Sequence, residues 1–216
     1  MNTQRSFVLA FDTANEVIAI GLGKLDAATQ SIECVASVEV EARRASNTQL
    51  VPRIDELCAR AGVAREKIAC VCVGRGPGSF TGVRIALATA KGIASALEVG
   101  LVGVSSLDAV AWGAWKAAER GELLVVADAM RREVYPVEYR LDDSGAARLT
   151  ADRVIKAEAF AEELEMCIRD SIEDAAGTAT LEGTATGVDE RGRLLVRTAD
   201  DTVPVASGEA HVMVMP

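Results

Sequence analysis

The segment Gly74-Arg-Gly-Pro-Gly-Ser-Phe-Thr-Gly82 decides the fold class of this chain. An uninterrupted apolar run, Ile68–Val73, precedes it and is typical of a buried strand. A helical pattern follows at about residues 81–97, and two of its faces carry apolar or small residues. A helix that docks on its own sheet needs one apolar stripe, so a second one indicates burial against more of the fold or against a partner chain. The segment therefore predicts a strand–turn–helix unit of an α/β protein.

Strand-like and helical patterns on either side of this unit repeat once along the chain. Three apolar runs between residues 7 and 40 predict an antiparallel meander, and a helix is expected at about 47–61. The first run ends at Asp12, and a later one ends in the same way at Asp128 and leads into another strand-like run. Two units that each open with a strand, an aspartate and a hairpin indicate a duplicated α/β fold whose second half begins near Glu122.

Composition narrows the class of protein. At 216 residues, half of them hydrophobic, the chain can form one large domain or two small ones. A net charge of −9 argues against strong unaided binding of nucleic acid, which usually needs a basic surface. Five cysteines without regular spacing predict reduced thiols rather than a zinc site. No apolar run reaches the roughly 20 residues that cross a bilayer and no signal peptide is evident, so we expect a cytoplasmic protein.

Several segments, in order along the chain, resemble the TsaB (YeaZ) family of bacterial tRNA threonylcarbamoyladenosine biosynthesis proteins. The most specific is Gly76-Pro-Gly-Ser-Phe-Thr-Gly-Val-Arg84, which an alanine-rich helix follows. The resemblance covers about Arg5 to Glu165. The other matching segments are Leu9–Thr13, Asn47–Pro52, Gly92, Val104–Leu107 and Asp128–Tyr135.

This resemblance implies a fold and a role. The fold is actin-like (ribonuclease-H-like, ASKHA), with an N-terminal lobe at 1–121 and a truncated second lobe at 122–165. The role is that of a non-catalytic subunit that pairs with TsaD, joined by TsaE, for N6-threonylcarbamoylation of adenosine 37 in tRNAs that read A-starting codons. Such a subunit needs no cofactor, meets tRNA only through the complex and can form a homodimer when alone. The alternative from another class is a stand-alone actin-like ATPase or small-molecule kinase.

The resemblance also implies a partner interface. In the family the first two helices of the N-terminal lobe pack with their counterparts in TsaD as a four-helix bundle. Here these helices are expected at about 47–61 and 81–97, and the second is the one with two apolar or small faces. The interface residues implied are Asn47, Leu50, Val51, Ile54, Leu57, Cys58, Val83, Arg84, Leu87, Ala88 and Lys91.

A degenerate nucleotide cleft is the second implied site, because Asp12 and Asp128 stand where actin-like ATPases hold the metal–phosphate ends of a nucleotide. Asp12 is followed by Thr-Ala-Asn-Glu rather than by a glycine-rich phosphate hairpin, and a carboxylate beside a triphosphate without a metal would repel it. The 76–82 segment matches no phosphate-binding motif, so a tight structural turn is favoured over nucleotide binding. The residues implied for this cleft are Asp12, Thr13, Gly78, Ser79, Thr81 and Asp128.

Hydrolytic chemistry is not expected. The chain has one histidine, His211, whereas a zinc protease needs two imidazoles at helical spacing or an equivalent ligand set. A Ser/His/Asp or Cys/His set would need another histidine. We therefore expect neither catalytic residues nor a metal site.

The C-terminal tail differs in character from the rest. Short strand-like runs separated by Asp- and Gly-bearing turns predict a small SH3-like β module at 177–216, after a junction at 166–176. Gly183–Val196 and Val203–Glu209 resemble the C-terminal module of biotin–protein ligase (BirA), whose catalytic domain has no counterpart here. Met166–Ser171 is similar to a translated sequencing adapter, so we interpret the chain as a chimeric sequence, an artificial join of two gene fragments that would expose apolar surface and dissolve poorly. The alternatives are a natural fusion with a small β domain and an accessory piece of a biotin ligase.

Overall fold

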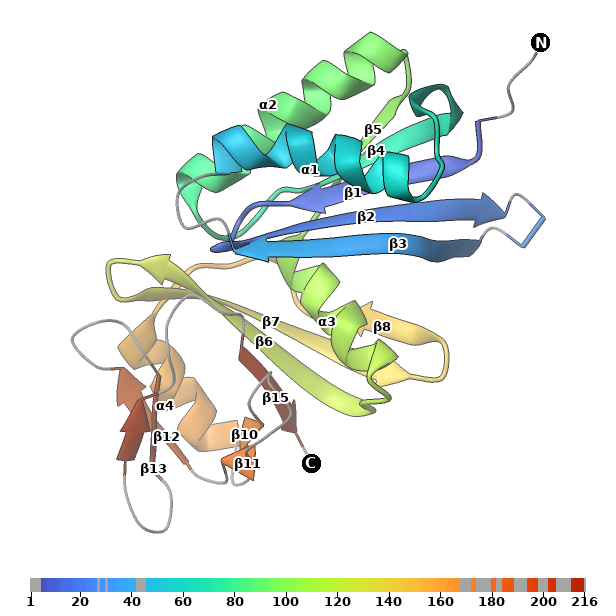
Figure 1. The fold of residues 1–216 in the computed structure, drawn as a ribbon. Helices are drawn as coiled ribbons and strands as arrows, with labels where there is room; N and C mark the ends of the chain where they lie inside the picture. The colour runs from blue at the N-terminus through green and yellow to red at the C-terminus, as the bar shows by residue number, and fades with distance from the viewer. Residues whose placement is uncertain are drawn as a thin grey trace. The chain divides into compact units, whose positions relative to one another are not determined.

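The structure is a computed structural model of the chain, and it forms two compact units, Met1–Ser106 and Leu107–Pro216, which are described separately (Figure 1). The residues that it describes are 5–26, 28–29, 31–41, 46–167, 172–173, 180–181, 184–188, 194–197, 202–204 and 211–215.

The first unit is built on a sheet of five strands in the order β3-β2-β1-β4-β5. β1, β2 and β3 form the expected antiparallel meander, and β4 and β5 join β1 in parallel. Parallel neighbours need a crossover, and the helices α1 and α2 provide the two crossovers of this sheet. The elements are β1 (Phe7–Asp12), β2 (Val17–Asp26), β3 (Ser31–Glu41), α1 (Ser46–Arg60), η1 (Arg65–Lys67), β4 (Ile68–Gly74), α2 (Phe80–Leu97) and β5 (Gly100–Val104).

Helices α1 and α2 lie on the same face of this sheet (Figure 1). Beneath them, alternate residues of β1 such as Leu9 and Phe11 are buried. α2 contributes Ala86, Ala90 and Ala94 to this core, and such small side chains allow the helix backbone to approach the sheet closely. The alanine-rich sequence of α2 thus reflects its close contact with β4.

The second unit repeats the antiparallel meander of the first. Its main sheet has the order β8-β7-β6-β15, in which β6 occupies the place of β1 and β7 that of β2. Of the duplication expected from the two strand–aspartate–hairpin segments, the structure shows the repeated meander, β1-β2-β3 and β6-β7-β8. The elements are α3 (Ser106–Lys116), β6 (Gly121–Met130), β7 (Glu133–Asp142), β8 (Gly145–Arg148), β9 (Ile155–Lys156), α4 (Ala157–Cys167), β10 (Ile172–Glu173), β11 (Thr180–Leu181), β12 (Thr184–Val188), β13 (Leu194–Arg197), β14 (Thr202–Pro204) and β15 (His211–Met215).

Helix α3 packs on this second sheet through Leu107 and Ala111. A polar group stands at the edge of the same core: the buried Tyr139 donates a hydrogen bond from its hydroxyl to Asp108 Oδ1 at 2.7 Å. Arg148 makes ion pairs with Asp108 at 3.5 Å and with Asp152. This network ties α3 to β7 and β8.

The tail departs from the expected module at its last strand. β12, β13 and β14 form a three-stranded antiparallel sheet, as a small β module requires. β15, however, pairs with β6 rather than with these strands. The SH3-like barrel and the division into 1–121, 122–165, 166–176 and 177–216 stay predictions.

Candidate functional site: a loop cluster and the face of helices α1 and α2

The loop between β4 and α2 is folded directly onto the turn between β1 and β2. The amide of Ser79 donates to the carbonyl of Ala14 at 2.6 Å, and the Thr13 hydroxyl donates to the carbonyl of Gly82 at 2.6 Å. A Cβ at Gly78 would overlap Ala14, and one at Gly82 would overlap the carbonyl oxygen of Thr13. Two of the glycines of this segment are therefore required by close backbone approach, which agrees with the structural turn favoured from the sequence.

The start of α2 uses its amides within the protein. Ser79 is the N-cap residue: its hydroxyl accepts from the Gly82 amide at 3.2 Å, and its own amide donates to the carbonyl of Ala14. A helix N-terminus binds a phosphate through free amides of its first turn. In this chain at least two of those amides already have partners, so the loop is poorly suited to hold a phosphate.

Asp12, at the end of β1, accepts one hydrogen bond from its own turn and one from the start of α3. Its Oδ1 accepts from the Ala14 amide at 2.6 Å, and its Oδ2 accepts from the Ser106 hydroxyl. The carboxylate also fills the space beside Gly74, where a Cβ would overlap it. Ser106 donates its own amide to the carbonyl of Gly76 at 3.0 Å. Asp12 thus joins the ends of β1, β4 and β5, a role in which both of its oxygens are used.

Asp128 occupies the equivalent position in the second unit. Its Oδ1 accepts from the Met130 amide at 2.7 Å, two residues on, just as Asp12 accepts from Ala14. Met130, Arg131 and Arg132 then follow with φ values of +65°, +56° and +62°, a left-handed run that costs free energy for residues with a Cβ. Of the expected cleft residues, all except Asp128 lie in the first unit, and the cleft as a whole stays a prediction.

The expected interface residues divide by burial. Leu50, Ile54 and Leu57 of α1 are 1%, 5% and 3% exposed and belong to the core of the first unit, so they support the helix rather than form its outer face. Cys58, Val83 and Leu87 are partly buried, and Asn47 has no described side chain. The exposed members are Val51, Arg84, Ala88 and Lys91.

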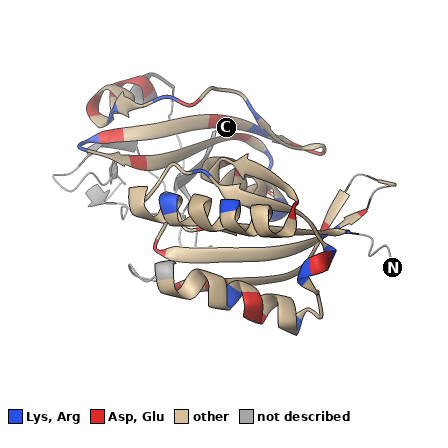
Figure 2. Ribbon diagram, turned by 90° about the horizontal axis from the view of Figure 1, so that it is seen from above, with Lys and Arg blue, Asp and Glu red and all other residues tan. Residues whose placement is uncertain are grey.

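The outer side of α2 is flat and basic. Ala88, Gly92 and Ala96 are exposed, and a Cβ at Gly92 would meet no atom within 4 Å. The charged residues of this helix are Arg84 and Lys91, and it has no acidic one, as Figure 2 shows. In a chain with a net charge of −9, this helix is therefore a local basic surface.

One exposed aromatic residue was not among the expected site residues. Phe80, the first residue of α2, is 69% exposed, and the Arg84 guanidinium lies 3.7 Å from the centre of its ring. The signal in the sequence is the spacing of four residues between an aromatic and an arginine, which places both on one face of a helix. Ser106, the partner of Asp12, was likewise not among the expected site residues.

Two cysteine thiols of the first unit, Cys58 and Cys72, have raised pKa values. Burial raises the pKa of Cys72 to about 11, and the neighbouring Cys70 adds to this shift. Burial also raises the pKa of Cys58. Because the thiolate is the reactive form, Cys58 and Cys72 are poor nucleophiles near neutral pH. Within the described part of the chain, no group of three or more His, Cys, Asp or Glu residues could hold a metal ion.

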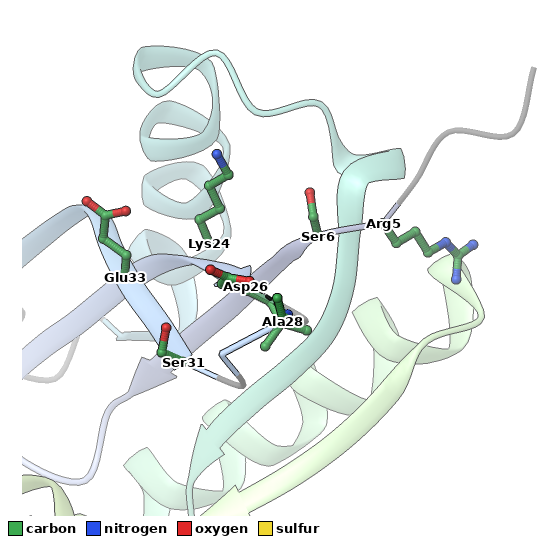
Figure 3. A pocket seen from close by; sticks show the side chains of 8 residues that line it. Arg5, Ser6, Lys24, Asp26, Ala28, Ser31 and Glu33 are labelled. Carbon is green, nitrogen blue, oxygen red and sulfur yellow. Dashed lines mark hydrogen bonds between the residues drawn. The ribbon is translucent and has the colours of Figure 1, made fainter.

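A surface hollow of about 500 Å³ lies at the end of the β2–β3 hairpin where β2 ends and β3 begins, away from the residues discussed above (Figure 3). Its lining mixes Arg5 and Lys24 with Asp26 and Glu33. Arg5 already donates to the carbonyl of Glu98 at 2.9 Å, and Asp26 accepts from the Ala28 amide at 2.8 Å, which lowers the pKa of Asp26. With its charges mixed and partly engaged, this hollow does not define a ligand site.

Comparison with known proteins gives the family. The family model described as "TsaD: tRNA N6-adenosine threonylcarbamoyltransferase" matches residues 38–182, and the model of the biotin protein ligase C-terminal domain matches residues 172–212. The chain is therefore built on the actin-like domain of the first of these families.

Individual relatives narrow the class. The tRNA threonylcarbamoyladenosine biosynthesis protein TsaB of Escherichia coli is 30% identical over 92% of this chain and 85% of its own length. The TsaB protein of Haemophilus influenzae is 31% identical over 61% of this chain and 53% of its own. The solved structure of YeaZ from Pseudomonas aeruginosa has a TM-score of 0.63 and 31% identity, over 71% of this chain and 68% of that one. The chain belongs to the TsaB (YeaZ) family of tRNA threonylcarbamoyladenosine biosynthesis proteins.

In the part of the chain that the structure describes, none of the helices has both the length and the apolar character to span a bilayer.

Proposed function

We propose that this chain is a non-catalytic subunit that pairs with TsaD, together with TsaE, for N6-threonylcarbamoylation of adenosine 37 in tRNAs that read A-starting codons. The observation that carries the proposal is the closed loop cluster at Asp12. An actin-like ATPase offers free amides and a carboxylate to a metal–phosphate group. In this chain the corresponding groups are hydrogen-bonded to its own loops. We place its action in the cytoplasm, where tRNA is modified.

The rival function, a stand-alone ATPase or kinase, would need those groups to be available. A phosphate placed at the start of α2 would have to displace the Ser79–Ala14 and Gly82–Ser79 hydrogen bonds. The carboxylate of Asp12 would also have to leave Ser106 and Ala14 before it could serve a metal. Both changes would open contacts that hold the ends of three strands together, so the geometry favours a supporting subunit.

For the partner surface we propose the outer side of α1 and α2. Its exposed members Val51, Ala88 and Gly92 offer a shallow apolar surface with little side-chain entropy to lose, and the small residues allow a helix of the partner to approach closely. Arg84 and Lys91 on the same helix favour a partner surface that carries carboxylates. The buried residues Leu50, Ile54 and Leu57 hold the two helices in place beneath it.

Reconstitution with purified components tests the proposed function. TsaD, TsaE, tRNA and a source of threonylcarbamoyl-AMP are incubated with and without the full chain, and modified adenosine is measured by mass spectrometry of the nucleosides. We expect modification when the chain is present with TsaD and none from the chain alone. Tight binding of Mg-ATP by the isolated chain, with phosphate released from it, would instead support the ATPase.

We infer separately that the tail is foreign to the family. The biotin protein ligase model begins at residue 172, while the Haemophilus alignment spans 132 residues. Against this, the Escherichia alignment spans 203 residues and the TsaD-type model extends to residue 182. A single long sequencing read of source DNA across codons 155–185 would distinguish an artificial join from a natural fusion. A read in which the codon of Glu165 is followed by the sequence of a complete second lobe supports the artificial join. A read that reproduces Met166–Ser171 and the tail establishes a natural fusion.

A further inference from the structure

β6 has the composition and burial of a central strand. Its segment Leu123–Ala127 is uncharged, and Leu123, Leu124, Val125 and Val126 are between 0% and 8% exposed. Successive residues of a strand point to opposite faces of the sheet, so burial of four in a row means that both faces of β6 are covered. A strand of this kind has strand neighbours along both of its edges.

The first unit shows what such a strand has beside it. β1, the counterpart of β6, pairs with β2 along one edge and with β4 along the other. In the second unit, β7 pairs with one edge of β6 from Gly121 to Met130. No strand of the described segment 107–167 takes the place of β4 on the other edge.

β15 fills this place, but in the opposite direction. Its five residues pair antiparallel with β6, from His211 opposite Val126 to Met215 opposite Glu122, whereas β4 runs parallel to β1. The first two residues of the strand, His211 and Val212, are the last of the segment that the biotin protein ligase model matches. The hydrogen-bonding groups of β6 that point away from β7 therefore find their strand partners in the C-terminal tail.

We propose that β6 presents a strand-docking edge, that the chain's own C-terminal strand occupies it, and that this occupation keeps two copies from pairing through β6. An uncharged apolar edge with unpaired amides and carbonyls is a template for strand addition by another chain. Two copies of β6 would meet with the same uncharged run facing itself, so a second copy is the competing occupant. The proposal concerns the second unit alone and does not rest on the proposed function.

The proposal is tested on the full chain with a double variant, Val212→Pro/Met213→Pro. The amides of successive strand residues point to opposite edges of the strand. One of residues 212 and 213 therefore has its amide toward β6, and substituting both by proline removes that amide. Val212→Thr/Met213→Thr is the matched control, because threonine keeps the amide and suits a strand. Hydrogen exchange of the amides of Leu123–Val126 and sedimentation velocity at equal concentration are the two measurements.

In the native chain and in the threonine control, we expect all four amides to be protected. In the proline variant, the alternate amides that do not donate to β7 should exchange at least about tenfold faster at a concentration low enough to keep the chain monomeric, and the sedimentation coefficient should rise as the concentration is increased. Fast exchange of these alternate amides in the native chain would overturn the proposal whether or not the variant folds. A proline variant that sediments like the native chain would remove the claim that β15 prevents self-association.

Discussion

Removal of the Tyr139 hydroxyl tests the network that ties α3 to β7 and β8. Tyr139→Phe keeps the ring, which is 1% exposed, so it creates no large cavity and removes only the 2.7 Å hydrogen bond to Asp108. A hydrogen bond to a charged group contributes about 1.5–3 kcal/mol to stability. The Asp108 side chain is 30% exposed and can recover water, so we expect a loss near the lower end, about 1.5 kcal/mol.

The pH dependence of the same variant gives a sharper test. Burial first, and the hydrogen bond to Asp108 second, raise the pKa of Tyr139 above its ordinary value of 10.0. The folded state therefore keeps the proton that the unfolded state releases above pH 10, so the native chain loses stability as the pH rises from there. Phenylalanine cannot ionise, so the stability difference between the two proteins should shrink, by at most about 1.4 kcal/mol per pH unit. Groups common to both proteins cancel in this difference.

Urea unfolding followed by tryptophan fluorescence is a suitable assay, because both tryptophans, Trp112 and Trp115, lie on α3 in the second unit. It should be run at pH 7 and at several values from about pH 9.5 to about pH 11, the range around pH 10 in which an unperturbed tyrosine ionises. A stability difference that stays constant above pH 10, or no difference at pH 7, would refute the role given to the Tyr139 hydroxyl.

Two further predictions concern backbone geometry. Gly82→Ala should destabilise the first unit by about 1–3 kcal/mol because its Cβ would overlap the Thr13 carbonyl, whereas Gly92→Ala on the same helix should stabilise it by about 0.5–1 kcal/mol. Equal effects of these two variants in thermal unfolding would contradict the packing described for the loop cluster. Arg131→Gly should stabilise the second unit by up to about 1 kcal/mol by relieving a left-handed φ of +56°, while Ala151→Gly, at a position without positive φ, should destabilise it. The denaturant midpoints of both variants measure these changes in stability. A destabilised Arg131→Gly would show that the contacts of the arginine side chain stabilise the unit by more than the backbone strain destabilises it.

Local patterns in the sequence were sufficient for the elements of the first unit. The apolar run at Ile68–Val73 and the helical spacing after Gly82 each depend on neighbours within a few residues, and both elements are found in place. The repeated strand–aspartate pattern also predicted the repeated meander, because Asp12 and Asp128 make equivalent hydrogen bonds to the amide two residues on.

Long-range pairing could not be obtained in the same way. The apolar run near His211–Met215 indicates a strand. Its partner depends on which strand elsewhere in the chain has an edge without a neighbour, and in the structure that strand is β6. The contact between Ser106 and Asp12 likewise joins residues 94 positions apart. The helical spacing of Leu50, Ile54 and Leu57 was correct for a helix, but spacing alone does not distinguish the face toward the sheet from the face toward a partner.

The most direct test of the proposed scaffold role is the binding of the full chain to purified TsaD, measured by co-elution in size-exclusion chromatography and by titration. Ala88→Glu places a charge on the exposed side of α2, where it costs the isolated chain little, and Ala109→Glu makes the same change at an exposed position of α3 as a control. A charge buried without a partner in an interface costs about 3–5 kcal/mol, which weakens binding at least about a hundredfold. We predict that the native chain and Ala109→Glu co-elute with TsaD and that Ala88→Glu does not. Binding of Ala88→Glu to TsaD with the affinity of the native chain would contradict the interface. Failure of the native chain to bind TsaD would contradict the scaffold role itself.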